Sequence, residues 1–372
     1  MRITIERAEL LSAAQNAQSV VERRNTIPIL ANVLVEAEGG QASFRATDLD
    51  IEIRDIARAS VEKPGAVTVN AVTLHEIVRK LPDGATVTLE DVPGENRISV
   101  RAGRSEFTLA TLPRQDFPEV ASPDYPSEFA IPAAQLKRLF DKSEFAISTE
   151  ETRYYLNGVY LHVAEATGGK VLRAVATDGH RLARVDAELP MGAEDMPGVI
   201  VPRKTVKEVR RLLSDEDATI GVSVADSKIR FASGELTLTS KVIDGTFPDY
   251  ARVIPSGNTR TMEVDADDFS KAVDRVATVS SERSRAVKMA LDEDRLVLSV
   301  SAPDAGTAQE EMAVAYGDEK LEIGFNARYL REIAAQVDRE NAVFKFNSSG
   351  DPALIQEGSD ESAVYVVMPM RV

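Results

Sequence analysis

The sequence predicts an α+β protein built from three repeated domains, each with two helices and antiparallel sheets. A strand that leads directly into a helix occurs three times, as ITIERAEL (3–10), FAIPAAQL (129–136) and MEVDADDF (262–269). A second strand–helix segment follows each of these, as VTVNAVTLHEIVRKL from Val67, VIVPRKTVKEVRRLL from Val199 and LEIGFNARYLREIAAQV from Leu321. Repeats about 125 residues long have the size of ordinary domains. They favour a quasi-symmetric assembly over a single active-site cleft.

The elements of the first repeat can be predicted in order. Residues 8–20 should form a helix with Leu10, Leu11, Ala14 and Ala17 on one face. The alternating segments 32–39 and 42–53 should be strands, and a second helix over 73–81 should end at Pro82-Asp83-Gly84. Three further strands are expected at 85–91, 96–103 and 105–112.

The later repeats follow the same order, with helices expected at 133–143, 203–213, 266–279 and 327–337. Pro-rich junctions at 117–129 and 247–260 both begin with Phe-Pro and an acidic residue. We therefore predict domains at 1–127, 128–258 and 259–372. Each domain contains two similar half-units, with sheets covering one side of the helices.

Composition limits the class of protein. The chain has 372 residues, 43% hydrophobic and 28% charged, with no cysteine, so neither disulfides nor Cys-ligated metals are expected. The start MRITIERAEL is charged and strand-like rather than a signal peptide, and no apolar run reaches the ~18–20 residues that span a bilayer. We expect a cytoplasmic protein without membrane contact.

The net charge of −16 argues against nucleic-acid binding, but the positive charges are concentrated in the predicted helices. Residues 203–213 contain five basic side chains and one acid, whereas acids gather in strands and loops such as 215–217 and 292–294. In a single helix, such basic residues more often form an ordinary solvent-facing surface. Because several of the predicted helices are basic, however, they favour a cationic surface built from helices.

Geometry then constrains the assembly that such helices could form around DNA. Six helices packed side by side at ~9 Å enclose a bore under ~10 Å, too narrow for a duplex of about 20 Å. Twelve helices enclose at least ~22 Å. Encircling DNA would therefore need two chains, arranged head to tail.

Two other classes of function would each require particular sequence features. Asp178-Gly179-His180 could be an acid–base pair, but Asp-Gly is more simply a turn signal. The three histidines, His75, His162 and His180, are not spaced as a metal-ligand pair, and phosphate-loop and nucleophile-elbow motifs are absent. No catalytic residue, metal or cofactor is predicted. The other alternative, a sequence-specific DNA-binding regulator, should carry a recognition-helix motif and bind short linear DNA.

Eight distinctive motifs follow one another along the chain: TIPILANVL (26–34), TLPRQDFPEV (111–120), RYYLNGVY (153–160), VATDGHRLA (175–183), VIVPRK (199–204), DGTFPDYARV (244–253), EIGFNARYL (322–330) and the ending YVVMPMRV (365–372). Through these motifs the whole chain resembles the bacterial DNA polymerase III beta subunit (beta sliding clamp) family. This resemblance implies three DNA-clamp domains whose helices line the inside of a ring, with the sheets outside. The ring is a homodimer that encircles double-stranded DNA without sequence specificity.

The resemblance also implies partners. A clamp loader opens the ring, and the clamp tethers the DNA polymerase III alpha subunit, other polymerases and repair proteins through short linear peptides. These peptides dock in one apolar pocket, which corresponds here to Leu156, Thr177, Gly179, His180, Arg181, Leu182, Pro248, Arg252, Val253, Asn326, Tyr329, Val366, Val367, Met368, Pro369, Met370 and Arg371. The methionines fit this role because their side chains adapt to different partners. A frayed final core strand is the alternative reading of the C-terminal segment.

Two further sets follow from the resemblance together with the positions of the helix charges. The DNA-contacting set is Arg24, Arg79, Lys80, Lys137, Arg138, Lys142, Arg203, Lys204, Lys207, Arg210, Arg211, Lys271, Arg275, Arg283 and Arg285. The dimer-interface set is Arg104, Phe107 and Leu109 from the first domain, with Val276, Val279, Glu310 and Glu311 from the third. Glu150 departs from the neutral polar residue that family members can have, so its loop is not counted as a DNA contact.

Overall fold

The structure is a computed structural model that describes residues 1–22, 26–120, 123–213, 215–280, 286–303, 305–338, 341–358 and 360–371. The chain divides into two compact units. Unit 1 comprises 1–134, 190–197 and 207–242, and unit 2 comprises 135–189, 198–206 and 243–372.

A strand, a helix and three strands form a half-unit that occurs six times along the chain. The first two are β1 (Arg2–Glu6), α1 (Arg7–Val20), β2 (Asn32–Glu38), β3 (Gln41–Thr47), β4 (Ile51–Arg58), and β6 (Gly65–Asn70), α2 (Ala71–Lys80), β7 (Thr86–Asp91), β8 (Arg97–Ala102), β9 (Ser105–Ala110). The next two are β10 (Ser127–Pro132), α3 (Ala133–Glu144), β11 (Gly158–Ala166), β12 (Gly169–Thr177), β13 (Arg181–Glu188), and β14 (Val199–Pro202), α4 (Arg203–Leu212), β15 (Thr219–Val224), β16 (Lys228–Ser233), β17 (Leu236–Lys241).

The last two half-units are β18 (Arg260–Asp265), α5 (Ala266–Ala277), β19 (Ala286–Asp292), β20 (Arg295–Ala302), β21 (Gly306–Ala313), and β23 (Leu321–Asn326), α6 (Ala327–Ala334), β24 (Asn341–Phe346), β25 (Ala353–Glu357), β26 (Asp360–Val367). Short strands β5 (Ser60–Lys63) and β22 (Ala315–Tyr316) and the 3₁₀ turns η1 (Pro28–Ala31), η2 (Arg114–Asp116), η3 (Glu151–Leu156) and η4 (Tyr250–Val253) complete the described elements. The predicted half-unit repeat is confirmed.

The six predicted helices are present, with ends that differ by up to three residues. Helix α2 begins two residues before the predicted start because the Asn70 side chain accepts a hydrogen bond from the Thr73 N–H at 2.9 Å. Asp265 caps α5 in the same way, through the Asp268 N–H at 2.8 Å. These side chains satisfy backbone donors that the first turn of a helix leaves without partners.

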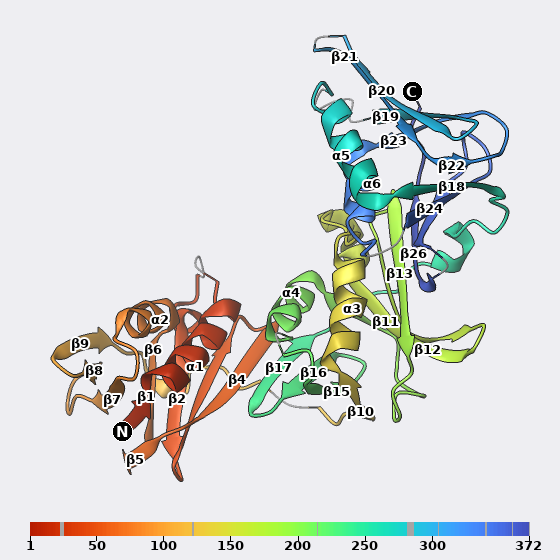
Figure 1. Ribbon diagram of the computed structural model, residues 1–372. Coiled ribbons are helices and arrows are strands. Elements are labelled where there is room, and N and C mark those ends of the chain that lie inside the picture. The colour runs from red at the N-terminus through yellow and green to blue at the C-terminus, as the bar shows by residue number, and fades with distance from the viewer. Residues whose placement is uncertain are drawn as a thin grey trace. The chain divides into compact units, whose positions relative to one another are not determined.

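Unit 1 contains a five-stranded sheet, β5-β1-β7-β8-β9, and an eight-stranded sheet, β10-β15-β16-β17-β4-β3-β2-β6. The two half-units of the first domain exchange their first strands, so that β1 pairs with β7 and β6 pairs with β2. Helix α1 buries Leu10, Ala13 and Ala17, lies against β3 and β4, and packs beside α2 (Figure 1). One face of this helix pair is therefore apolar, and the other carries the polar side chains.

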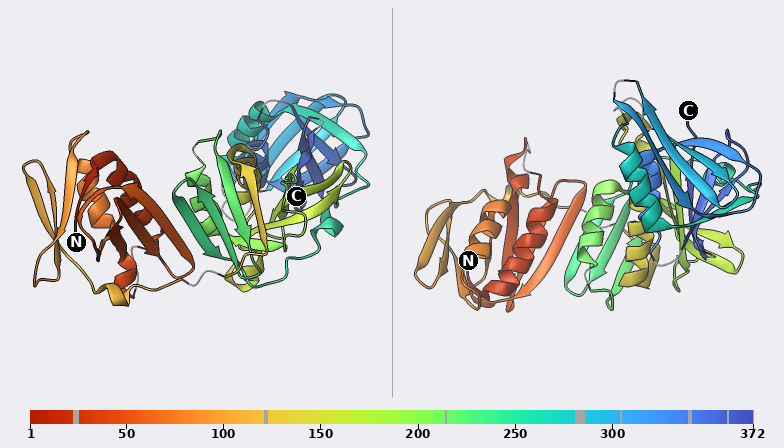
Figure 2. Two further views of the ribbon diagram at one scale, coloured as in Figure 1. Left: turned by 90° about the horizontal axis from the view of Figure 1, so that it is seen from below. Right: turned by 45° about the horizontal axis from the view of Figure 1, so that its top comes forward.

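Unit 2 contains a nine-stranded sheet, β14-β11-β12-β13-β26-β25-β24-β18-β22, and a four-stranded sheet, β21-β20-β19-β23. First strands are exchanged here too, since β18 pairs with β24 and β23 pairs with β19. Helices α5 and α6 pack against each other, and Phe269 of α5 meets Phe344 of β24 with ring centroids 5.1 Å apart. Figure 2 shows this helix pair against its strands from two further directions.

Two edge-to-edge strand pairings carry sheets across the predicted domain boundaries. Strand β4 of the first predicted domain pairs with β17 of the second, and β13 of the second pairs with β26 of the third. The compact units do not follow the predicted boundaries because these sheets are continuous, and the three-domain division remains a prediction. Among the described helices, none combines the length and the apolar character needed to cross a membrane.

Candidate functional site

A tight turn between β12 and β13 lies at the centre of the candidate site. The Thr177 hydroxyl accepts a hydrogen bond from the Gly179 N–H at 3.0 Å and donates to the Arg181 carbonyl at 2.7 Å. One Asp178 oxygen accepts from the N–H groups of His180 and Arg181, at 2.9 and 3.0 Å. Gly179 has φ +86°, a left-handed conformation that favours glycine. The TDGHRL segment is therefore a rigid side-chain-capped turn.

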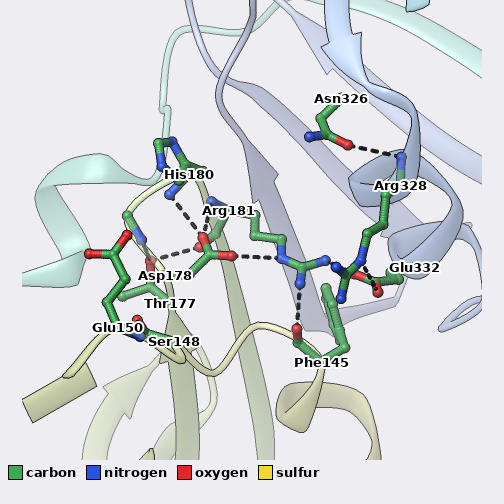
Figure 3. Close-up of polar contacts among 11 residues, drawn as sticks. Phe145, Ser148, Glu150, Thr177, Asp178, His180, Arg181, Asn326, Arg328 and Glu332 are labelled. Carbon is green, nitrogen blue, oxygen red and sulfur yellow. Dashed lines mark hydrogen bonds and ion pairs between the residues drawn. The ribbon is translucent and has the colours of Figure 1, made fainter. Parts of the chain in front are cut away.

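Arg181 connects this turn to helix α6 and to the end of α3. Its buried guanidinium pairs with Asp178 at 3.1 Å and with Glu332, and it donates to the Phe145 carbonyl at 2.6 Å (Figure 3). The guanidinium carbon also lies 4.4 Å from the ring centroid of Tyr329. A buried arginine with this many partners holds three elements in one arrangement.

The carboxylate of Glu332 completes this ionic group. Burial raises its pKa, but hydrogen bonds from Arg328, at 2.8 Å, and from Arg181 outweigh burial and lower the pKa below its ordinary value. Glu332 therefore stays charged at neutral pH and compensates the buried Arg181.

An apolar pocket of about 310 Å³ lies beside the turn, in unit 2. It is lined by Arg153, Tyr155, Leu156, Thr177, Gly179, His180, Arg181, Leu182, Pro248, Asp249, Tyr250, Val253, Val366 and Met368. Leu156, Leu182 and Val366 belong to one buried apolar cluster with Phe247. The pocket has a size and lining suited to a few apolar side chains.

The C-terminal segment forms one wall of the pocket. Val366 pairs with Leu182 in register between β26 and β13, and the Met368 N–H then donates to the His180 carbonyl at 2.9 Å. The Met370 N–H donates to the Gly324 carbonyl at 2.7 Å. Met368 and Met370 remain 42% and 38% exposed although their backbone is fixed. Large apolar side chains held at the surface in this way are typical of a binding site.

Comparison with known proteins identifies the family. Family models of the DNA polymerase III beta subunit match its N-terminal domain over residues 1–121, its central domain over 130–249 and its C-terminal domain over 251–371. The chain belongs to the DNA polymerase III beta subunit, or beta sliding clamp, family.

Relatives of this family match over the full length. The beta sliding clamp of Caulobacter vibrioides is 52% identical over 372 residues, covering 100% of both chains. That of Pseudomonas aeruginosa is 40% identical over 375 residues, again covering 100% of both. The solved sliding clamp (DNA polymerase III subunit beta) of Bartonella birtlesii bound to griselimycin has a TM-score of 0.96 and 48% identity, covering 100% of both chains.

Ten of the residues assigned to the clamp's peptide pocket line the cavity. They are Leu156, Thr177, Gly179, His180, Arg181, Leu182, Pro248, Val253, Val366 and Met368. Sequence reasoning missed Arg153, Tyr155, Asp249 and Tyr250. All four lie inside the RYYLNG and FPDYARV motifs. Other residues of these motifs were assigned to the pocket, so the motifs themselves could have identified the four.

The other residues assigned to the pocket lie around it. Asn326 caps α6 by accepting from the Arg328 N–H at 3.0 Å, and Tyr329 stacks on His180 with centroids 6.4 Å apart. Arg252 is exposed and pairs with Asp249 at 2.7 Å. Val367 is fully buried on the opposite face of the strand from Val366, so it supports the sheet rather than facing a ligand. Pro369, Met370 and Arg371 follow Met368 beyond the lining.

The predicted DNA-contacting cations differ in exposure. Seven are exposed: Arg79, Lys80, Arg203, Lys207, Arg211, Lys271 and Arg275. Four are half-buried: Lys137, Arg138, Lys204 and Arg210. Arg24, Arg283 and Arg285 lie outside the described residues.

Lys142 requires a correction. It is only 7% exposed, and its ammonium contacts Asp338 at 2.9 Å, Glu357 at 3.3 Å and the Gln336 carbonyl at 2.5 Å. Its role is to connect α3 to the region around β25, because a buried lysine with these partners does not face a phosphate. The sequence shows that this helix is rich in basic residues, but it does not show which of them face inward.

Most of the predicted interface residues lie on or near two sheet edges that have no neighbouring strand among the described residues. Arg104, Phe107 and Leu109 are on or beside β9, the edge of the five-stranded sheet, and Glu310 and Glu311 are on β21, the edge of the four-stranded sheet. Val279 is half-buried just after α5. Val276 is buried in the core face of α5, so its assignment to an exposed interface is corrected to helix packing.

Glu310 already has a partner in its own chain. Arg275 donates to its two carboxylate oxygens at 2.9 and 2.5 Å, and this hydrogen bond is the main reason that the pKa of Glu310 lies below its ordinary value. Arg275 is exposed and Glu310 is half-buried at the surface, so the pair can exchange partners at little cost.

Proposed function

We propose that two copies of this chain form a ring that encircles duplex DNA and holds replication proteins on it. The pattern of sheet edges carries this proposal. The last strands of the six half-units are β4, β9, β13, β17, β21 and β26. Four of them are joined antiparallel within the chain, as β4 with β17 and β13 with β26. The remaining two, β9 and β21, are edges that the described part of the chain leaves unpaired.

The symmetry of these junctions supports pairing of β9 from one copy with β21 from another. An unpaired edge strand presents backbone donors and acceptors that favour addition of a further strand. Phe107 on β9 is 37% exposed, which provides an apolar contact at that edge. Two identical β9–β21 junctions would close a head-to-tail dimer.

Molar mass in solution tests the dimer. We expect light scattering to give about twice 40.4 kDa, and a Phe107→Asp variant to give the monomer mass because the edge would acquire a buried charge. Met191→Asp is the matched control, since Met191 is 88% exposed and lies outside both edges. A monomeric wild-type protein at micromolar concentration would contradict the proposal.

The exposed helix cations support contact with DNA that does not depend on sequence. Arg203 and Lys207 project from α4, and Lys271 and Arg275 from α5. Arginine and lysine bind phosphates through charge, which carries no information about base sequence. A ring needs only this weak attraction, because closure itself retains the DNA.

Retention on DNA separates this proposal from a sequence-specific regulator. After loading, the protein should remain on closed circular DNA and leave linear DNA through its free ends. Preferential, salt-sensitive binding to one short open duplex would favour the regulator instead.

The pocket supports docking of short linear peptides from the polymerase III alpha subunit, the clamp loader, and other polymerases and repair proteins. A labelled peptide with the clamp-binding segment of the alpha subunit should bind wild-type protein, and deletion of residues 368–372 should abolish this binding while the fold is retained. Griselimycin, found with the Bartonella clamp, is a second probe that should compete with the peptide. Peptide binding that survives the deletion would place the site elsewhere.

The proposed role is that of a processivity factor in the cytoplasm, without catalysis of its own. The Asp178 carboxylate accepts two backbone N–H groups and pairs with Arg181, so it stabilises the turn and is not available as a base for His180. Turnover that disappears in His180→Ala would overturn this assignment.

A further inference from the structure

Three polar side chains form a row across the nine-stranded sheet. The same sheet contributes Leu182 and Val366 to the pocket, and we call these two residues, with Leu156, the pocket floor. His162 of β11 lies opposite Arg173 of β12, and Arg173 lies opposite Asp186 of β13. Directly opposed residues share a face of a sheet, as do residues two and four positions apart along a strand. Leu182 is four residues before Asp186 on β13, so the polar row and this part of the pocket floor occupy one face.

Arg173 fixes the hydroxyl of a pocket residue. Its Nε and Nη2 donate to the two carboxylate oxygens of Asp186 at 2.6 and 2.8 Å, and its Nη1 donates to the Tyr250 hydroxyl at 3.3 Å. Burial opposes the charge of Arg173, but the bidentate contact with Asp186 raises its pKa above the ordinary value. The donor to Tyr250 is therefore always present.

His162 holds the same hydroxyl from the other side. Its Nδ1 lies 2.9 Å from the Val163 carbonyl, which can only accept, so Nδ1 carries the proton. Its Nε2 lies 3.0 Å from the Tyr250 hydroxyl and accepts from it. The hydrogen bonds then run in one direction, from Arg173 to Tyr250 to His162 to the Val163 carbonyl.

Aromatic stacking fixes the imidazole in this position. The His162 ring stacks on Tyr160 with centroids 4.4 Å apart, and Tyr160 stacks on Phe247 at 5.0 Å. Phe247 belongs to the apolar cluster that contains the pocket floor. The polar row is thus connected to the pocket through both Tyr250 and the aromatic stack.

We propose that His162 and Arg173 are positioning residues that hold Tyr250 as a wall of the peptide pocket, and that tight peptide binding needs a neutral imidazole at position 162. Tyr250 lines the pocket while its hydroxyl is held between the two side chains. This inference rests on the proposed function, because it assigns a further role at the peptide pocket.

Protonation of His162 would reverse one hydrogen bond. Nε2 would become a donor, and the Tyr250 hydroxyl, which already accepts from Arg173, would lose its acceptor. The titratable or charged groups near His162 are Tyr250 from η4, Arg173 from β12, Asp186 from β13 and Tyr160 on β11 itself. Burial lowers the pKa of His162, and the Arg173 charge acts in the same direction, while Val163 and Asp186 oppose it. The imidazole is therefore neutral at pH 7.

The test measures the dissociation constant of the labelled alpha-subunit peptide at about pH 7.5, with melting temperatures recorded in parallel. His162→Phe keeps the stacked ring but removes the acceptor, so affinity should fall about three- to tenfold, the effect of one hydrogen bond. His162→Gln restores an acceptor and should bind within about twofold of wild type. Tyr250→Phe should weaken binding as His162→Phe does, and the double variant should be no weaker than either single one.

Tyr154→Phe is the matched control, because this neighbouring tyrosine is 52% exposed and lies outside the pocket lining. It should bind as wild type does. Full affinity in His162→Phe, or additive losses in the double variant, would overturn the inference. If wild-type protein does not bind the peptide at all, the proposed function fails instead.

A pH series separates positioning from a merely structural role. Between about pH 7.5 and about pH 5.5, wild-type affinity should fall more steeply than that of His162→Gln, because only the wild type can protonate residue 162. Any contribution from His180 is common to both proteins and cancels in the comparison. Parallel pH profiles, with only the melting temperature changed, would reduce His162 to a structural residue.

Discussion

Two turns in the molecule have the same backbone conformation but carry different side chains, which form different kinds of contact. The segment 47–52 joins β3 to β4, and the segment 177–182 joins β12 to β13. In each, a threonine hydroxyl accepts from the N–H two residues later at 3.0 Å, and an aspartate oxygen accepts from two further N–H groups. The third residue is left-handed in both, with φ +81° at Leu49 and φ +86° at Gly179.

The fourth residue of each turn accepts an equivalent backbone hydrogen bond from a residue at the end of a neighbouring strand. The Lys241 N–H donates to the Asp50 carbonyl at 2.8 Å, as the Met368 N–H donates to the His180 carbonyl at 2.9 Å. At the first turn, Lys241 and Asp50 also form an ion pair of 3.0 Å. At the second turn, methionine and histidine line the pocket instead.

A third position differs beneath the turns. Glu52 pairs with Arg45 at 3.5 Å, whereas its counterpart Leu182 belongs to the apolar cluster with Val366. The duplicated backbone therefore does not make the pocket. Side chains at a few positions turn one copy into an apolar site and the other into an ionic junction.

The largest effect should come from exchanging the left-handed residues. Gly179→Leu adds about 1–2 kcal/mol of backbone strain, and its Cβ would lie 2.4 Å from an Arg153 nitrogen, displacing a residue that lines the pocket. We expect the affinity for the alpha-subunit peptide to fall about 100-fold or more, because the added side chain occupies space that must bury an apolar group. Fluorescence anisotropy measures this.

Leu49→Gly is the matched control for that exchange. It relieves a strained leucine that is 42% exposed, so peptide affinity should not change and the melting temperature should hold or rise. Equal loss of affinity in both variants would mean that the two turns are not functionally distinct.

An intermediate effect on peptide affinity is expected when the ion pair of the first turn is introduced at the equivalent positions of the second turn. His180→Asp combined with Met368→Lys should lower peptide affinity by about ten- to thirtyfold, through lost apolar contact. The folding free energy should change by less than about 1 kcal/mol, because an exposed ion pair contributes little. Calorimetric titration and urea denaturation give the two values, and Lys241→Met is the control that should leave peptide affinity unchanged.

The smallest effect concerns the pH dependence at Glu52. Burial raises the pKa of Glu52, and the nearby Arg45 charge only partly offsets this. A raised folded-state pKa means that ionised Glu52 lowers stability above its ordinary pKa, and that this cost disappears as pH falls.

Glu52→Gln should therefore be slightly more stable than wild type at pH 7, by less than about 1 kcal/mol, with the difference vanishing near about pH 4. Urea denaturation at both pH values checks this. A variant that is less stable at pH 7 would show that the Arg45 contact outweighs burial.

Sequence reasoning reached the helices through local signals, and it reached much of the pocket lining through the resemblance to the clamp family. Apolar periodicity placed all six helices, and the TDGHRL and FPDYARV motifs led to the pocket lining. What it missed depends on contacts between distant residues. Phe145 and Glu332 are far apart in the chain, yet both hold Arg181. Similarly, only packing shows that Lys142 and Val276 face inward.

The pairing of β4 with β17 has a consequence for synthesis of the chain on the ribosome. The edge of β4 stays without its neighbour until roughly 180 further residues have been translated, on the order of 10–40 s at about 5–20 residues per second. An open strand edge in a nascent chain invites association with other polypeptides. Strand β4 carries four charged side chains, Glu52, Arg54, Asp55 and Arg58. These charges disfavour such association until β17 has been synthesised and pairs with β4.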